Sequence, residues 1–130
     1  MAEGRVLAKK LILTGDVNLM NVADPAEPFR KIRDELHAAD VVFGNLECCL
    51  HLPPLRHSQA NEGFFADPVV GGEALKLGRI HAVGIANNVN YGAHNIAASI
   101  ARLDQMSAHL ADTRRRAEAG TGPDGAMASP

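Results

Sequence analysis

The chain has 130 residues, of which 46% are hydrophobic and 22% are charged, and its formal net charge is −2. This size fits one compact domain and leaves no room for a large second one. The mixed charge gives no electrostatic footprint for a nucleic acid or an anionic membrane, and the one dense basic run, residues 114–116, is typical of a solvated helix face.

The two cysteines are adjacent, at Cys48 and Cys49, so they offer neither a spaced disulfide framework nor a CxxC zinc motif. The N-terminal region lacks the apolar segment of a signal peptide, and the apolar run at residues 11–14 is too short to span a membrane. We therefore expect reduced thiols, no membrane span and a cytoplasmic protein.

Strand and helix signals alternate through the first part of the chain. A strand is predicted over residues 5–14, with residues 11–13 inside the protein. A helix is predicted to start with Asp24 as its N-cap and Pro25 as its first residue, with Glu27 placed to complete a capping-box-like pair. Its apolar residues fall on one stripe: Phe29, Ile32, Leu36 and Ala39.

A second strand is predicted at residues 41–43, which are continuously apolar and therefore expected to be buried on both faces, and Gly44 is expected to end it. Residues 47–61 are predicted to form a long loop, and residues 64–66 a short extended segment. Asp67 and Pro68 then start a second helix, which is expected to stop at Gly78.

A third strand is predicted over residues 80–86, and a last helix from Ala93 onward. The apolar face of this helix is expected to comprise Ile96, Ile100, Leu103, Met106 and Leu110. The alternation predicts an α/β fold with three mainly parallel strands and intervening helices. We expect a part-domain over residues 1–119 and a disordered tail over residues 120–130.

Polar side chains follow each predicted strand: Asp16 after the first, Asn45 and Glu47 after the second, and Asn87 and Asn88 after the third. The carboxyl ends of parallel strands meet at one edge of a sheet, where α/β proteins bind ligands. Carboxylate and amide oxygens suit Mg²⁺ or Mn²⁺. The alternative interpretation is a turn aspartate and a pair of loop-stabilising asparagines.

The segments LTGDVNLM, ADVVFGNLE, FFADP, AVGIANNVNYG and ASIARLD occur in this order over about residues 11–106. Together they resemble the amino-terminal part of the CapA family, the poly-γ-glutamate capsule-synthesis proteins of the metallophosphoesterase superfamily. The resemblance implies a four-layer αββα fold with a two-metal site at the sheet edge. Asp16, Glu47 and Asn88 match metal-binding positions, and Asn45 and Asn87 lie beside them.

The resemblance further implies that divalent metal ions such as Mn²⁺ or Mg²⁺ activate a water for attack on a phosphoryl group. The substrate is then expected to be a phosphoester or a molecule related to polyglutamate. Family members commonly carry a histidine where this chain has Val89, so a matching general acid is absent and the catalytic residue is unassigned. His94, one helical turn further on, is the candidate substitute.

The family domain normally continues with further strands and histidine-bearing loops that complete the metal site. We therefore expect a truncated chain with an incomplete site and little activity alone. The alternative function is a non-catalytic remnant or interaction module that pairs its open sheet edge with another chain, including a second copy. A nucleotide-binding half-domain is disfavoured, because no GxGxxG or GxxxxGK[ST] motif follows the first strand.

Overall fold

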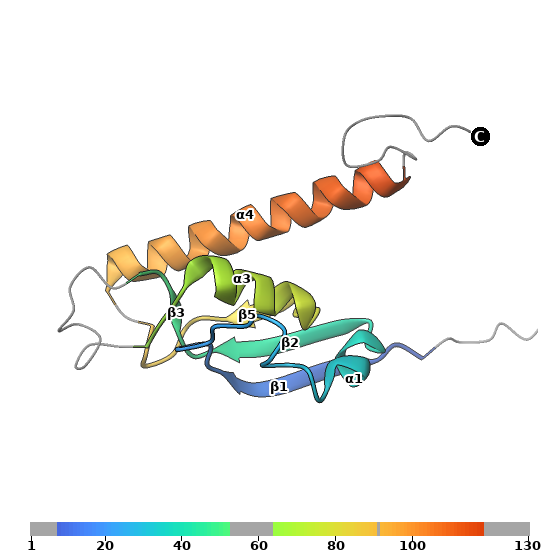
Figure 1. Cartoon of the computed structure of the whole chain (residues 1–130), viewed down its shortest axis with the longest axis horizontal. Helices are drawn as coiled ribbons and strands as arrows, with labels where there is room; N and C mark the ends of the chain where they lie inside the picture. The colour runs from blue at the N-terminus through green and yellow to red at the C-terminus, as the bar shows by residue number, and fades with distance from the viewer. Residues whose placement is uncertain (1–7, 53–63, 91, 119–130) are drawn as a thin grey trace, which may run out of the picture.

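The computed structural model describes residues 8–52, 64–90 and 92–118, with side chains up to Ser107. Its main sheet contains three parallel strands in the order β1 (Leu11–Val17), β2 (Val41–Leu46) and β5 (Ala82–Gly84). A second, two-stranded parallel sheet pairs β3 (Cys49–Leu50) with β4 (Phe65–Ala66). The described helices are α1 (Arg33–His37), α3 (Pro68–Leu77) and α4 (Ala93–Glu118) (Figure 1).

The α/β class and the parallel arrangement of the three main strands confirm the prediction from the sequence. β5 is shorter than predicted, at Ala82–Gly84 instead of residues 80–86. β3 was not predicted, because its two residues lie within the segment expected to be a loop. The proposed tail at residues 120–130 lies outside the described residues.

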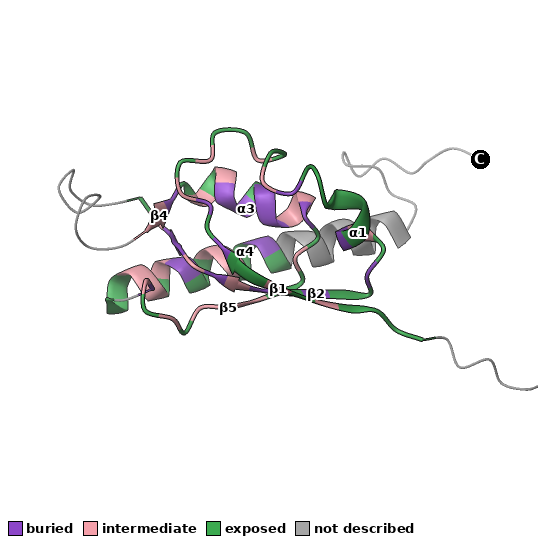
Figure 2. Cartoon of the chain, turned by 90° about the horizontal axis from the view of Figure 1, so that it is seen from below, coloured by how far each residue is buried: buried purple, intermediate pink, exposed green. Residues whose placement is uncertain are grey.

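Among the described elements, α1 and α3 lie on one face of the main sheet and no helix covers the other, open face (Figure 2). Along β2, Val42, Gly44 and Leu46 are buried, whereas Val41 and Phe43 are exposed. The prediction that this strand is buried on both faces is therefore wrong. Side chains of a strand alternate between its two faces, and helices pack on only one face of this sheet.

The first strand follows the same alternation, which corrects a second prediction. Ile12 packs against the core, but Leu11 and Leu13, also expected inside, lie on the open face. A continuous apolar run in the sequence does not distinguish a strand buried on both faces from one whose second face is apolar and exposed. The open face of the sheet consequently carries large apolar side chains.

β1 contains a β-bulge and extends beyond its predicted end. Leu13 pairs with Phe43 and Asp16 with Asn45, so Thr14 and Gly15 together stand opposite the single residue Gly44. The strand therefore continues to Val17 instead of stopping at Thr14, and β2 continues through Gly44 to Leu46. The extra residue brings Asp16 to the open face, which is the face of Leu13.

Gly44 is the residue that leaves room for this bulge. A Cβ atom at position 44 would lie 2.7 Å from Thr14 Oγ1 and 3.2 Å from Val17 Cγ2. Gly44 was predicted to end the strand. Its observed role is to accept the Thr14 side chain inside a continuing ladder, because any larger residue would collide with it.

The predicted helix from Asp24 is replaced by successive turns up to residue 32, and α1 begins only at Arg33. Asp24 still caps the start of this segment, because its Oδ1 accepts a hydrogen bond from Ala26 N at 2.9 Å. The hydrogen bonds that follow span three residues instead of four, as from Glu27 N to Asp24 O at 3.1 Å. The Glu27 carboxylate pairs with Arg30 at 2.8 Å, which is a different contact from the predicted capping box.

Three of the four predicted stripe residues in this segment are still buried: Phe29, Leu36 and Ala39. Ile32 is exposed, because the turns change the angular spacing of side chains from that of an α-helix. The buried residues join β1, β2, α3 and α4 in one core: Val17, Leu19, Phe29, Leu36, Ala39, Val42, Leu46, Cys48, Leu50, Ala66, Ala74, Leu75 and Met106.

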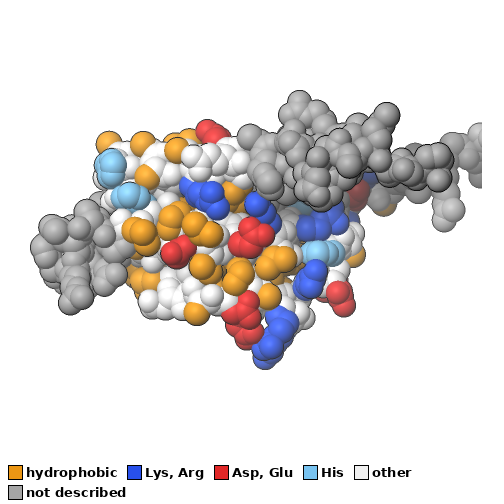
Figure 3. All heavy atoms as spheres, turned by 45° about the horizontal axis from the view of Figure 1, so that its top comes forward, with side chains coloured by type: hydrophobic (Ala, Val, Ile, Leu, Met, Phe, Trp, Pro, Cys, Tyr) orange, Lys and Arg blue, Asp and Glu red, His pale blue; other side chains and the backbone are white. Residues whose placement is uncertain are grey.

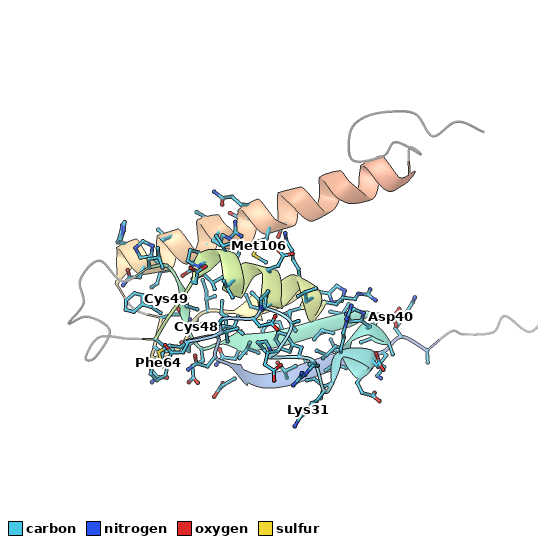
Figure 4. All side chains as sticks on the ribbon, in the orientation of Figure 1. Lys31, Asp40, Cys48, Cys49, Phe64 and Met106 are labelled. Carbon is cyan, nitrogen blue, oxygen red and sulfur yellow. The ribbon has the colours of Figure 1, made fainter. Side chains whose placement is uncertain are left out.

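The second predicted helix is confirmed as α3. Asp67 accepts hydrogen bonds from Val69 N at 2.8 Å and from Val70 N at 2.9 Å, and Gly78 is the C-cap. α3 packs against α4 through Gly72, where a Cβ atom would lie 2.9 Å from Met106 Sδ. Met106 points from α4 toward α3 (Figure 4).

α4 begins at Ala93 and its backbone continues through the arginine triplet to Glu118. Met106 is buried and Leu103 packs against the core, as predicted for the apolar face of this helix. Ile100, predicted on the same face, is exposed, which corrects that assignment. The Leu110 side chain lies outside the described residues.

Candidate metal centre

The predicted polar residues of β1 and β2 meet at the carboxyl edge of the main sheet. Asp16 and Asn45 are paired across the two strands, and Asn45 Nδ2 donates a hydrogen bond of 2.7 Å to Asp16 Oδ1. Asp16 is exposed and Asn45 is half-buried. The β1 bulge makes this contact possible, because it brings Asp16 to the same face of the sheet as Asn45.

Asn87, three residues beyond β5, continues the contact across the third strand. Its Nδ2 donates hydrogen bonds of 3.0 Å to both Asn45 Oδ1 and Leu46 O. Each of the three parallel strands, or the loop that follows it, therefore contributes one side chain to a connected set of hydrogen bonds. We call Asp16, Asn45 and Asn87 the edge chain. The expected meeting of these three residues is found.

Asn90 supports the edge chain and is absent from the residues predicted above. It is 5% exposed, and its Nδ2 donates to Leu46 O at 2.7 Å and to Asn87 Oδ1 at 3.3 Å. Asn87 Oδ1 also accepts the backbone N–H groups of Val89 at 3.2 Å and Asn90 at 3.1 Å. These bonds to residues two and three positions on are typical of an asparagine turn, and the NNVN sequence was the available signal for them.

Asn90 Oδ1 is buried and has no hydrogen-bond partner among the described residues. An unpaired buried carbonyl oxygen is costly, so a polar group such as a water molecule is expected to contact it. Asn90 Nδ2 contacts Leu46 O, the carbonyl that also receives Asn87 Nδ2. The buried side of the edge chain is therefore fixed by two asparagine amides on one backbone carbonyl.

Glu47 lies one residue beyond the end of β2. Its backbone N–H donates to Val17 O at 2.9 Å, which continues the pairing of the two strands. Leu46 and Cys48 on either side of it are fully buried, whereas Glu47 is half-buried. This alternation places the Glu47 side chain on the face of Asn45 and Asp16.

Asn88, the third residue matched to a metal position, follows Asn87 and is exposed. Val89 stands where the family commonly has a histidine, and it contacts its surroundings through its backbone. Its N–H donates to Asn87 Oδ1 at 3.2 Å, and its carbonyl accepts from Cys49 Sγ at 3.8 Å. An alkyl side chain at this position can supply neither a metal ligand nor a proton.

His94, the candidate proton donor, is exposed in the first turn of α4. Its ring lies against the ring of His51, with 5.1 Å between the two ring centroids and 80° between the two planes. The contact that the structure provides for His94 is therefore with the residue after β3. Its catalytic role stays a prediction.

Cys48 is adjacent to Glu47 in sequence and fully buried (Figure 4). Burial raises the pKa of the Cys48 thiol to about 11, the Leu19 backbone hydrogen bond opposes this, and the neighbouring Cys49 and Glu47 add to it. The thiol is therefore protonated at neutral pH. A protonated thiol is a poor nucleophile and a poor metal ligand, so Cys48 belongs to the core.

The donor set at this edge fits part of the coordination sphere of one hard cation. Asn45 Oδ1 and Asn87 Oδ1 already accept hydrogen bonds, which leaves the second Asp16 oxygen, the Glu47 carboxylate and the Asn88 amide. These are oxygen donors of the kind preferred by Mg²⁺ and Mn²⁺. Among the side chains that the structure describes, in residues 8–52, 64–90 and 92–107, no three His, Cys, Asp or Glu residues group to hold a metal.

Two further observations concern the surface. The face seen in Figure 3 carries acidic and basic side chains interspersed with apolar ones. No helix within the described part of the chain is both long enough and apolar enough to cross a membrane.

The chain is an α/β protein with a parallel sheet. At the carboxyl edge of this sheet, where such proteins bind ligands, acid and amide side chains are joined by hydrogen bonds. A family model described as "Bacterial capsule synthesis protein PGA_cap" matches residues 5–123. The chain belongs to this family of bacterial capsule synthesis proteins, which confirms the resemblance found from the sequence. No curated protein matches the chain.

Proposed function

We propose that this capsule synthesis protein binds a divalent cation at the carboxyl edge of its sheet through Asp16, Glu47 and Asn88, as part of a phosphoesterase-type site. The observation that carries the proposal is the 2.7 Å hydrogen bond from Asn45 to Asp16 between neighbouring strands. It holds one carboxylate oxygen of Asp16 and leaves the other available to a ligand. Family membership supports the same site.

The residues of the edge chain would orient ligands before a cation arrives. Asn87 donates to Asn45 Oδ1, which orients the Asn45 amide with its Nδ2 toward Asp16. Preorganised ligands lose little conformational freedom when a cation binds. This raises the affinity for a hard cation that would otherwise be held weakly. When bound, such a cation polarises a phosphoryl oxygen and lowers the pKa of a coordinated water.

The substrate proposed is a phosphoester or a molecule related to poly-γ-glutamate. The described residues provide only part of such a catalytic site. Val89 cannot donate a proton, and the ring of His94 contacts His51. We therefore expect hydrolysis by this chain to be slow in isolation, although cation binding does not require a proton donor.

An interaction module is the second candidate function. β1 and β5 lie at the two edges of the main sheet, and β1 presents seven residues along its edge. Unpaired backbone groups on such an edge can pair with a strand of another chain, including a second copy. This function needs no cation and would be unaffected by neutralising the edge carboxylates.

The test is hydrolysis of phosphomonoester and phosphodiester substrates in Mn²⁺ by the native chain, Asp16→Asn and Glu47→Gln. Both changes keep the shape of the side chain and remove its charge. We expect each to lower the rate by about 10- to 100-fold. Glu73→Gln on α3 is the matched control, because Glu73 is an exposed carboxylate that pairs with Lys76 at 3.5 Å. Equal rates for all four proteins, measurably above the rate without protein, would exclude the proposed site.

A further inference from the structure

His51 and His94 form a pair of imidazole rings outside the proposed cation site. His51 directly follows β3, and His94 lies in the first turn of α4. Their ring centroids are 5.1 Å apart, with 80° between the two planes. His94 is exposed and His51 is half-buried, so solvent reaches the pair. Histidine side chains lie side by side at the left of the surface in Figure 3.

The backbone segments that carry the two rings are joined by a buried hydrogen bond. Leu50, the residue before His51, donates its N–H to Ser99 Oγ at 3.0 Å. Leu50 and Ser99 are each 1% exposed. Ser99 Oγ donates in turn to the carbonyl of Asn95, the residue after His94, at 2.9 Å. The rings therefore extend from two elements whose relative position is already fixed by packing and hydrogen bonds.

The separation of the rings suits two imidazoles on one transition-metal ion. A Zn–N bond is about 2.0–2.1 Å long, so two imidazoles on a tetrahedral ion have centroids about 5 Å apart. The centroid of an imidazole lies close to the axis of its χ2 bond, and this torsion is broad. Rotation about χ2 can therefore turn a nitrogen of each ring toward a common ion while the 5.1 Å separation is kept.

We propose that His51 and His94 together bind a transition-metal ion of the Zn²⁺, Ni²⁺ or Cu²⁺ class, with water at its remaining positions. Imidazole nitrogen suits these ions, whereas the oxygen donors at the sheet edge suit Mg²⁺ and Mn²⁺. Two protein ligands form a weaker site than the three or four ligands of zinc enzymes and zinc fingers. The inference is independent of the proposed cation site, because the two sites share no residue.

A metal ion at this pair would link β3 to the start of α4. A contact between β3 and the turn before α4 already exists, because Cys49 Sγ donates to Val89 O at 3.8 Å. The same turn bonds to the edge chain through Val89 N and Asn87 Oδ1, at 3.2 Å. An ion that binds only the folded chain raises its stability in proportion to the logarithm of the ion concentration. Zn²⁺ is therefore expected to raise the unfolding temperature through His51 and His94.

The test is calorimetric titration of the full chain with Zn²⁺. We expect one ion per chain with a dissociation constant of about 1–100 µM, as befits an open site with two protein ligands. His51→Gln and His94→Gln should each weaken binding by about tenfold or more. His37→Gln is the matched control, because the His37 ring contacts Leu77 O at 2.8 Å and belongs to a different part of the fold. Circular dichroism checks that each variant is folded.

A second measurement uses the native chain alone and needs no variant. In nuclear magnetic resonance spectra, substoichiometric Ni²⁺ should broaden the ring signals of His51 and His94 before those of His37 and His81. Neither His51→Gln nor His94→Gln should change Mn²⁺ binding, so failure of one site is distinguishable from failure of the other. Absence of Zn²⁺ binding below about 1 mM overturns the proposal. Zn²⁺ binding that is unchanged in both variants also overturns it, and assigns the ion to other groups.

Discussion

Asn45 Nδ2 donates a 2.7 Å hydrogen bond to Asp16 Oδ1, and the two residues are direct partners on neighbouring parallel strands. The contact depends on the β1 bulge. Without the extra residue between Leu13 and Asp16, the carboxylate would lie on the helix-covered face among buried apolar side chains. The bulge therefore determines whether the sheet edge has a ligand-competent carboxylate.

Gly44→Ala is expected to destabilise the protein by about 1–3 kcal/mol, because the new Cβ atom would lie 2.7 Å from Thr14 Oγ1. Urea denaturation measures the change. Gly15→Ala on the same bulge is the control, since a Cβ atom at Gly15 meets nothing within 4 Å. Thr14→Ala should recover part of the loss in the double variant. Equal stabilities of Gly44→Ala and Gly15→Ala would contradict the close approach at Gly44.

Asn87 and Asn88 are neighbours in sequence with different expected effects. Asn87→Ala removes the hydrogen bond to Asn45 Oδ1 and the oxygen that accepts the Val89 and Asn90 N–H groups, so a loss of about 2–3 kcal/mol in unfolding free energy is expected. Asn88→Ala, at an exposed position, should change it by less than about 0.5 kcal/mol. Thermal or urea unfolding compares the two variants, and similar losses would refute the assignment of Asn87 to the edge chain.

The raised pKa of the Cys48 thiol predicts a loss of stability at alkaline pH. Its pKa is raised by burial from 9.0 to about 11 in the folded protein, so the unfolded chain releases its proton first as pH rises. The resulting stabilisation of the folded protein, roughly 2–3 kcal/mol, is fully present below about pH 9 and is lost as the pH rises to about 11. Urea unfolding under reducing conditions measures it. Cys48→Ala should show a shallower decline over this window, and an unchanged decline would contradict the burial effect.

Asp67→Ala should cost about 1 kcal/mol of stability, because the side chain accepts the backbone N–H groups of Val69 and Val70 at the start of α3. Asp67→Asn keeps an acceptor oxygen and should cost less. Chemical denaturation distinguishes the two variants. A loss in Asp67→Asn as large as in Asp67→Ala would show that the negative charge, and not the hydrogen bonds, supports the helix.

The parts of the fold that follow from local rules were predictable from the sequence. α3 begins and ends where Asp67 and Gly78 indicate, because capping depends on a few neighbouring residues. The parallel order of the three strands and the meeting of Asp16, Asn45 and Asn87 also follow from strand–helix alternation and strand polarity.

The remaining features depend on contacts between distant segments. The bulge in β1 depends on the absence of a side chain at Gly44, about 30 residues away in sequence, and no pattern within β1 signals it. The turns after Asp24 begin with the expected cap but are packed into the core through Phe29, whose ring lies against Gly78. The exposure of Leu11 and Leu13 depends on which face of the sheet receives the helices.

The account rests most directly on divalent cation binding at Asp16. Titration of the full chain with Mn²⁺, followed by loss of the electron paramagnetic resonance signal of the free ion, measures this binding without any need for catalysis. The native chain and Glu73→Gln should bind Mn²⁺ equally, whereas Asp16→Asn should bind it about tenfold or more weakly while retaining its fold. Equal Mn²⁺ affinity in Asp16→Asn and the native chain would contradict the central claim.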